Sequence, residues 1–224
     1  MPPPAPVVFY AFAFDGAPVD PGQRGWFVAP ATAHLLAPRA RTALGRAASS
    51  TIEIFRCRGA VGVGGAVRCD SARLLHVGEV VHELRWFALY CARSVANRWT
   101  PPHLVHEYLR TGDPELRDVA FDRARGAFAV SSDLARLAAR ATMFATADDD
   151  PAVCAREACR LASRIAALDA PESLVHVKDH QERALASTLL ARADARARTG
   201  EEPPYEPLAG AEGSDSSELP TYAA

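Results

Sequence analysis

The stretch Thr51-Ile-Glu-Ile-Phe-Arg-Cys-Arg58 is the clearest β-strand in the sequence, and it runs into Gly59. β-Branched and aromatic residues favour strands, whereas glycine favours turns. The glycine-rich stretch Val61-Gly-Val-Gly-Gly65 predicts such a turn, because glycine adopts positive φ angles without strain. Two candidate strands follow, at Ala66–Cys69 and Arg73–Val77. Short strands at this spacing predict a small antiparallel sheet.

Two further candidate strands lie towards the N-terminus. The run Val7-Val-Phe-Tyr-Ala-Phe-Ala-Phe14 stops at the turn pair Asp15-Gly16, and Gly25-Trp-Phe-Val28 is a shorter candidate. Residues 30–50 favour neither strand nor helix clearly. The sequence therefore predicts a β-rich part over residues 1–81.

The second half of the chain predicts helices. From His82 to Trp99, apolar residues recur at the spacing of one helix face: Leu84, Phe87, Ala88, Cys91 and Val95. Later helices are expected to start at Thr100-Pro101, Asp113-Pro114 and Asp150-Pro151, where a side-chain acceptor precedes proline. Gly112 is a candidate helix stop. A last helix is expected at about Asp179 to Arg198.

Apolar stripes mark the sides on which two of these helices should pack. Residues 151–168 carry the stripe Cys154, Ala158, Leu161, Ile165 and Leu168, and the preceding helix carries Leu134, Leu137, Ala138 and Ala141.

The predicted fold class is α+β. A small N-terminal antiparallel sheet precedes an alanine-rich bundle or array of about five helices, over residues 82–198. We expect this helical part to pack on residues 1–81 as one compact unit.

The charge distribution distinguishes a tail from the body. Residues 199–224 contain six acidic residues and no Lys or Arg, so the net charge of −2 divides into about −6 for the tail and about +4 for the body. Few large apolar residues occur in the tail, which is predicted to be disordered. The body contains 24 arginines and Lys178, a bias typical of a GC-rich genome.

Cysteine usage and the N-terminus indicate a compartment. The five cysteines form no C-x-x-C motif and their number is odd, so a secreted disulfide framework is not expected. Cys57 and Cys69 could face each other across a hairpin, as small buried residues. The N-terminal segment has no basic region followed by a long apolar run, as a signal peptide would, and no transmembrane segment is expected. We therefore predict a cytoplasmic protein, or one of the host cytoplasm or nucleus if it is viral.

Two groups of titratable residues are candidate chemical sites. Glu79, His82 and Glu83 gather at the junction between sheet and helices, where carboxylate and imidazole could act in acid–base catalysis. His103 and His106 lie three residues apart on a predicted helix, a spacing that can bind zinc. A third metal ligand is not evident, and first-turn Glu and His also suit a helix dipole. We therefore expect neither a catalytic site nor a metal or other cofactor.

An arginine ridge is the candidate binding surface. Arg156, Arg160 and Arg164 recur every four residues, opposite the apolar stripe, and Arg136 and Arg140 could extend them. Such a ridge can contact nucleic-acid phosphates or an acidic partner. Only Phe128 and Phe144 are aromatic nearby, so base stacking has little support. A solvated helix face is the better explanation of the ridge, and a binding surface is the alternative.

The tail contains short patterns that resemble interaction motifs. Tyr205-Glu-Pro-Leu208 resembles a tyrosine-based sorting signal, and Leu219-Pro-Thr-Tyr222, with Pro220 at its second position, resembles a ligand of WW domains. Both patterns have a meaning only in a eukaryote or its virus.

Two segments carry a broader resemblance. The strand-turn-strand-helix segment from Ile52 to Phe87, with Glu53-Ile-Phe-Arg-Cys-Arg-Gly and Arg68-Cys-Asp-Ser-Ala-Arg-Leu-Leu, resembles a region of small uncharacterised proteins from phages, GC-rich bacteria and large DNA viruses. The alanine-rich helices from Phe87 to Ala167 are similar to those of some helical immunity proteins of bacterial toxin systems. The resemblance implies no functional residues.

The function best supported by the sequence is a non-enzymatic one, in which the body binds a protein partner whose identity is unknown. An immunity-like protein and a virus- or phage-encoded accessory protein are two forms of this hypothesis. One alternative is a nucleic-acid-associated protein that uses the arginine ridge. A second alternative is a small metal-dependent or acid–base enzyme.

Overall fold

The computed structural model describes residues 7–14, 26–27, 51–61, 67–131 and 133–199. The chain divides into two compact units. One comprises Met1–Ala37, Ser49–Val80 and Leu189–Ala224, and the other comprises Pro38–Ala48 and Val81–Thr188. The change from strand to helix thus coincides with the division between Val80 and Val81. The predicted α+β class is confirmed.

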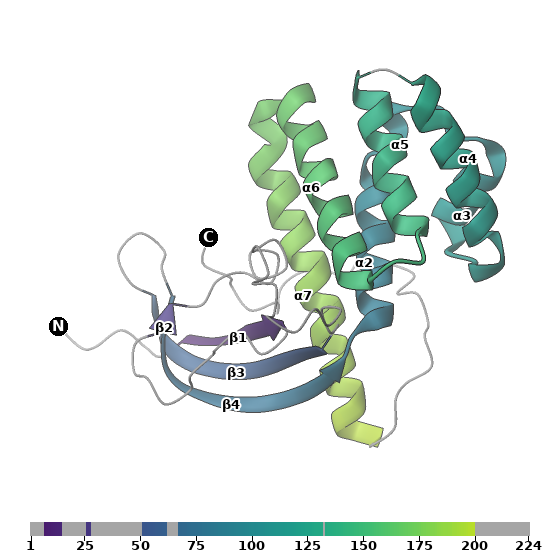
Figure 1. Ribbon diagram of the computed structural model, residues 1–224. Coiled ribbons are helices and arrows are strands. Elements are labelled where there is room, and N and C mark those ends of the chain that lie inside the picture. The colour runs from purple at the N-terminus through teal and green to yellow at the C-terminus, as the bar shows by residue number, and fades with distance from the viewer. Residues whose placement is uncertain (1–6, 15–25, 28–50, 62–66, 132, 200–224) are drawn as a thin grey trace, which may run out of the picture. The chain divides into compact units, whose positions relative to one another are not determined.

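The first unit contains an antiparallel sheet. Within the described residues it has four strands in the order β1-β3-β4-β2, as Figure 1 shows. The strands are β1 (Val7–Phe14), β2 (Trp26–Phe27), β3 (Thr51–Val61) and β4 (Val67–Glu79). The long strand predicted from residues 51–58 is therefore the central β3, which pairs with both β1 and β4.

One side of this sheet carries the buried apolar residues. The register places Phe12 of β1 opposite Ile54 of β3, and both side chains are almost completely buried. Ile52 is also buried, and it lies on the same side because side chains two residues apart in a strand share a face. Arg56, two residues further on, is exposed. A register shift between Ile54 and Phe55 interrupts the alternation at that point.

Two expectations for this sheet were wrong. The segments Ala66–Cys69 and Arg73–Val77 do not form separate strands, because β4 is continuous from Val67 to Glu79. Cys57 and Cys69 do not face each other across the hairpin. The register pairs Cys57 with Ala72 and pairs Cys69 with Gly59.

The second unit is helical. The α-helices of the described residues are α2 (Val81–Ser94), α3 (His103–Thr111), α4 (Arg117–Val130), α5 (Asp133–Thr146), α6 (Pro151–Asp169) and α7 (Leu174–Thr199). Helix α7 is divided between the units, because its residues from Leu189 onwards belong to the first unit. Short 3-10 helices occur at Ala96–Arg98 (η2), Pro114–Leu116 (η3) and Pro171–Ser173 (η4). Helix α2 packs on α5 and α6, α5 packs on α6, and α4 packs on α3 and α5.

The apolar stripe predicted for residues 82–99 forms the centre of this helical core. Leu84, Phe87, Ala88, Cys91 and Val95 are all buried. The facing helices contribute many alanines, including Ala138, Ala141, Ala155, Ala158 and Ala162. Because an alanine side chain is short, helices that meet through alanines can approach closely. In α5, Leu134 and Leu137 of the predicted stripe are only half-buried.

The α6 stripe was correct except at its end. Cys154, Ala158, Leu161 and Ile165 are buried, but Leu168 is 59% exposed. Leu168 lies in the last turn of α6, which ends at Asp169. The side of α6 on which Leu168 lies was predicted correctly, but within the described part of the chain no neighbouring helix covers its side chain enough to bury it. Leu168 is therefore a surface residue.

Two of the three predicted helix starts are confirmed by their capping bonds. The Asp150 carboxylate accepts hydrogen bonds from the Ala152 and Val153 N–H groups at the start of α6. The Asp113 carboxylate accepts one from the Glu115 N–H, although the element that it begins is η3. Thr100 does not cap α3, because that helix starts only at His103 and Pro102 occupies its N-cap.

The predicted end of α3 is confirmed, whereas the start of α7 differs from the prediction. Gly112 ends α3 with a φ of 72°, the left-handed conformation that glycine adopts most readily. Helix α7 begins at Leu174, earlier than the expected Asp179.

Residues 200–224, which include most of the tail that was predicted to be disordered, lie outside the described residues. Thr199 is the last residue of α7. No helix in the described part of the chain is long and apolar enough to cross a membrane.

Candidate functional site

Helices α4 and α5 form a hairpin, one side of which carries three arginine and three phenylalanine residues. Phe121, Arg125 and Phe128 recur on α4 at a spacing that places them along one side of the helix. Arg136, Arg140 and Phe144 recur in the same way on α5. The three arginines are exposed and the three phenylalanines are half-buried. We call these six residues the hairpin face.

The tight connection between the helices brings the two rows together. Helix α4 ends at Val130 and α5 begins at Asp133. Asp133 has a φ of 47°, a left-handed conformation that Asp tolerates better than most residues. The Arg136 Nε donates a 2.8 Å hydrogen bond to the Ser131 carbonyl, which ties the first turn of α5 to this connection.

Each arginine of the hairpin face lies over a phenylalanine ring. The Arg136 Cζ atom is 5.9 Å from the centre of the Phe128 ring on the neighbouring helix. The corresponding distances are 5.7 Å for Arg125 and Phe121 within α4, and 5.8 Å for Arg140 and Phe144 within α5. These distances are within the range of cation–π attraction, which stabilises each contact by about 0.5–1 kcal/mol at exposed sites. The rings therefore help to hold the guanidinium groups in place.

The hairpin face has an excess of positive charge. Residues 117–146 contain five arginines and three aspartates, which gives a net charge of +2. Arg125 forms an ion pair with Asp122 at 3.0 Å. Arg136 and Arg140 have no acidic partner among the residues that the structure describes. These two exposed cations can therefore bind an external anion without first breaking an internal ion pair.

The arginines of α6 have different surroundings. Arg156 and Arg160 both lie near the Glu157 carboxylate, at 3.6 and 3.8 Å, while Arg164 is exposed. No described contact joins these three residues to Arg136 or Arg140. The arginines of the predicted ridge thus fall into an aromatic group on the hairpin and a group on α6 that Glu157 partly neutralises.

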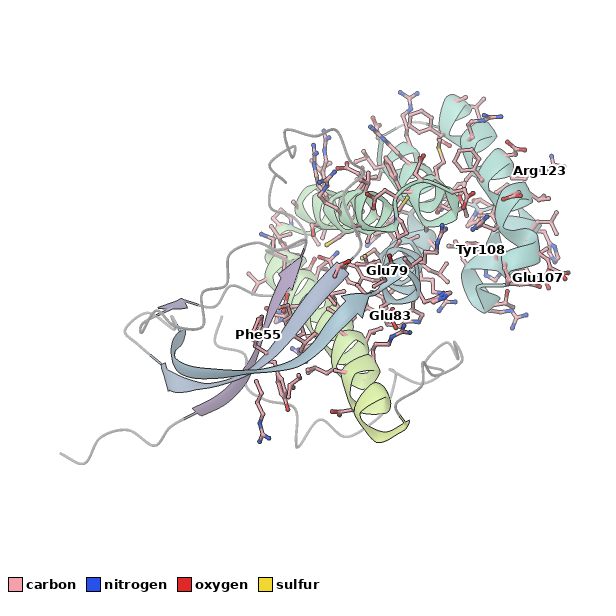
Figure 2. The ribbon with its side chains drawn as sticks, turned by 60° about the horizontal axis from the view of Figure 1, so that its bottom comes forward. Phe55, Glu79, Glu83, Glu107, Tyr108 and Arg123 are labelled. Carbon is pink, nitrogen blue, oxygen red and sulfur yellow. The ribbon has the colours of Figure 1, made fainter. Side chains whose placement is uncertain are left out.

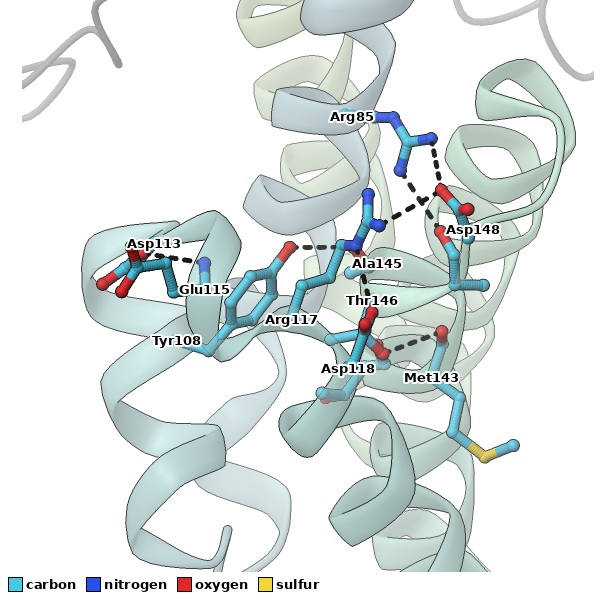
Figure 3. A network of polar contacts seen from close by, with 12 residues as sticks. Arg85, Tyr108, Asp113, Glu115, Arg117, Asp118, Met143, Ala145, Thr146 and Asp148 are labelled. Atoms are coloured by element: carbon cyan, nitrogen blue, oxygen red, sulfur yellow. Dashed lines mark hydrogen bonds and ion pairs between the residues drawn. The ribbon is translucent and has the colours of Figure 1, made fainter.

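A polar network anchors the base of the hairpin (Figure 3). The Asp148 carboxylate lies 3.2 Å from both the Arg85 and the Arg117 guanidinium groups. The Arg85 side chain also donates to the Ala147 carbonyl, and the Tyr108 hydroxyl donates to the Ala145 carbonyl. These contacts connect α3 to the last turn of α5, and connect α2 and the start of α4 to the segment that follows α5. They fix both ends of the hairpin within the helical unit.

The candidate acid–base residues do not share a face. His82 is exposed and Glu83 is buried, and consecutive residues of a helix point in directions about 100° apart. Glu79 is exposed at the end of β4 and belongs to the sheet unit (Figure 2).

The candidate metal ligands are both on the surface of α3. His103 and His106 are exposed, and the neighbouring Glu107 is half-buried. Among the described residues, no three histidine, cysteine or acidic side chains lie close enough together to hold a metal ion. A zinc site at these histidines therefore has no third protein ligand in that part of the chain.

The described cysteines have the surroundings of structural residues. Cys91, Cys154 and Cys159 are free thiols and are buried. Burial and a hydrogen bond with Cys159 raise the pKa of the Cys91 thiol well above its ordinary value. Burial, together with the Asp149 charge, raises the pKa of Cys154 to about 11. Because a thiol reacts as its thiolate, neither residue resembles a catalytic nucleophile.

Sequence analysis identified only part of the hairpin face. Arg136 and Arg140 were predicted surface residues, whereas Phe121 and Arg125 were missed although their spacing of four residues was a readable signal. The tail residues Tyr205, Leu208, Leu219, Pro220 and Tyr222 lie outside the described residues.

The chain matches no protein-family model, and no characterised protein or solved structure matches it significantly.

Proposed function

We propose that this chain is a non-enzymatic protein-interaction protein and that the hairpin face is its partner-binding surface. The observation that carries the proposal is the set of three exposed arginines, each lying over a half-buried phenylalanine ring. Arginine and aromatic residues are enriched where proteins bind each other. An arginine held against a ring also loses less conformational entropy on binding than one that moves freely in solvent.

The environment of the hairpin face supports this function better than a catalytic one. Helix α4 buries only small side chains, Ala120 and Ala124, and its Phe121 and Phe128 side chains are only half-buried beside the arginines of the hairpin face. The Asp148 network holds the base of the hairpin in position. A fixed surface that combines cations with apolar groups suits the binding of a protein. Catalysis would instead need converging titratable groups.

A photo-crosslinking experiment tests this function. A photoreactive amino acid is placed at Ala129, which is exposed and lies four residues after Arg125 on the same side of α4. The matched control places it at Leu168, which is 59% exposed on α6. In cells that make the protein, we expect Ala129 to give a defined protein adduct that is absent at Leu168. The adduct should disappear when Arg136→Gln and Arg140→Gln are added.

The dependence on the two arginines separates specific binding from random collision. Both are exposed and lack an acidic partner among the described residues, so their replacement should leave the fold unchanged. The same adduct at Ala129 and Leu168, or an adduct at Ala129 that persists in the Arg136→Gln/Arg140→Gln variant, would show that the hairpin face is not the binding surface.

A further inference from the structure

We propose that the hairpin face binds an extended acidic segment of a partner protein, one in which carboxylates occur at alternate residues. This inference rests on the proposed function and specifies the chemistry of the partner. It follows from the hydrogen-bonding chemistry of the guanidinium groups, from the spacing of the two arginine positions along α5 and from the position of each guanidinium group over a phenylalanine ring.

The guanidinium groups are suited to carboxylates. A guanidinium that lies against a ring still presents its N–H groups at its edge, where they can form paired hydrogen bonds with a carboxylate. Arg136 and Arg140 have no acidic partner within the described part of the chain. Arg125 already binds the Asp122 carboxylate at 3.0 Å, and so shows the kind of contact that the other two can make.

The spacing of the two unpaired arginines favours an extended segment. Arg136 and Arg140 are four residues apart on α5, which corresponds to about 6 Å along the helix axis. In an extended strand, side chains two residues apart point to the same side and are separated by roughly 6.6 Å. Two carboxylates at alternate positions therefore match the rise between the two arginine positions on α5.

The length of the face limits the size of this segment. From Arg136 to Phe144 the face extends about 12 Å along α5. An extended chain covers this length with about four residues. The face therefore fits a short acidic sequence better than a long acidic helix.

The covered rings favour a peptide over a nucleic acid. Proteins that bind single-stranded nucleic acids usually stack bases on exposed aromatic faces. In the hairpin face, an arginine of the chain itself lies over each ring. The local net charge of +2 is also modest for a surface that would follow a phosphate backbone. Carboxylates paired with individual guanidinium groups agree better with both observations.

Fluorescence anisotropy with a defined probe tests the inference. The probe is a labelled short peptide that alternates glutamate with threonine, and the control peptide has the same composition with its glutamates in one block. The protein is the full chain in which the tail acids are replaced by their amides, so that the tail cannot compete; these acids are Glu201, Glu202, Glu206, Glu212, Asp215 and Glu218. We expect salt-sensitive binding of the alternating peptide, and weaker binding of the block peptide.

Matched arginine variants locate the binding surface. Arg136→Gln with Arg140→Gln should weaken binding of the alternating peptide by about tenfold or more. Arg160→Gln with Arg164→Gln removes the same charge from exposed positions on α6 and should leave the affinity within about twofold. Equal losses in the two double variants would mean that the peptide senses only net charge, and would overturn the inference.

Other molecules that bind the hairpin face would give different results in these experiments. Tighter binding of a single-stranded polyuridine RNA that requires Arg136 and Arg140 would assign the face to nucleic acid and overturn the inference. A peptide that binds the tail-neutralised chain but not the natural chain would assign the face to the protein's own acidic tail. Absence of peptide binding with a persistent, arginine-dependent adduct at Ala129 would refute the acidic segment while leaving the proposed function intact.

Discussion

Gln181 of α7 and Cys159 of α6 form two hydrogen bonds with each other inside the helical unit. The Gln181 amide nitrogen donates to the Cys159 carbonyl at 3.3 Å, and the Cys159 thiol donates to the Gln181 side-chain oxygen at 3.4 Å. The same oxygen accepts a 2.9 Å hydrogen bond from the Ser163 hydroxyl. A single buried amide therefore connects α7 to two side chains and one carbonyl of α6.

The variant Gln181→Ala should be destabilised by about 1–3 kcal/mol, because it removes three hydrogen bonds between α6 and α7. Chemical denaturation followed by circular dichroism measures this loss. The control is Lys178→Ala, at an exposed position on the same helix, which should change the free energy of unfolding by less than about 0.5 kcal/mol. Equal effects in the two variants would show that the amide network contributes nothing to stability.

The two described helix-associated glycines should respond to alanine in opposite directions. Gly126 lies within α4, and a Cβ atom there would have nothing within 4 Å, so Gly126→Ala should stabilise the protein by about 0.5–1 kcal/mol. Gly112 has a φ of 72°, and a Cβ atom there would lie 3.2 Å from the Leu89 Cδ2 atom. Gly112→Ala should therefore destabilise it by roughly 1–2 kcal/mol. If thermal unfolding showed that both variants change the stability of the protein in the same direction, this explanation from backbone conformation would be wrong.

Buried and exposed leucines of α6 provide another comparison. Leu161 is 6% exposed, and truncation to alanine should leave a cavity that costs about 2–5 kcal/mol. Leu168, on the same helix, is 59% exposed, so Leu168→Ala should change stability by less than about 0.5 kcal/mol. Urea denaturation would contradict this assignment if both truncations had the same cost.

The buried residues of α2 and α6 show what hydrophobic periodicity can and cannot predict. The spacing of Leu84, Phe87 and Cys91 identified the buried side of α2, because that whole side is covered by other helices. The same argument failed at Leu168, since periodicity gives the side of a helix but not how far along it a neighbour extends. The start of α7 was missed because Val175 and Val177 are poor helix formers, although both residues are helical in the structure.

Contacts between helices were the least predictable part of the hairpin face. Arg140 and Phe144 are four residues apart, so their contact is local and can be read from spacing. Arg136 and Phe128 lie on different helices, and their contact depends on the tight connection at Asp133. The predicted ridge grouped Arg136 with the α6 arginines, because sequence alone does not show which neighbouring helix a side chain contacts.

The raised pKa of Cys154 predicts a loss of stability at alkaline pH. Burial is the main cause of the shift from the ordinary value of 9.0 to about 11, and the nearby Asp149 charge adds to it. Below pH 9 the thiol is protonated in both the folded and the unfolded chain, so its contribution to stability is fully present. Between about pH 9 and pH 11 the unfolded chain loses this proton more readily than the folded one. The free energy of unfolding should therefore fall across this window.

The pH dependence of a Cys154→Ala variant isolates this residue. Tyr90 and Cys91 also have raised pKa values and contribute to alkaline destabilisation in both proteins, so the relevant quantity is the difference between the two slopes. Denaturant unfolding measured from pH 8 to pH 11 should give a shallower decline for Cys154→Ala than for the natural chain, even though the variant is less stable at neutral pH. Parallel declines would mean that the Cys154 thiol titrates alike in the folded and unfolded states, and that its burial does not oppose ionisation.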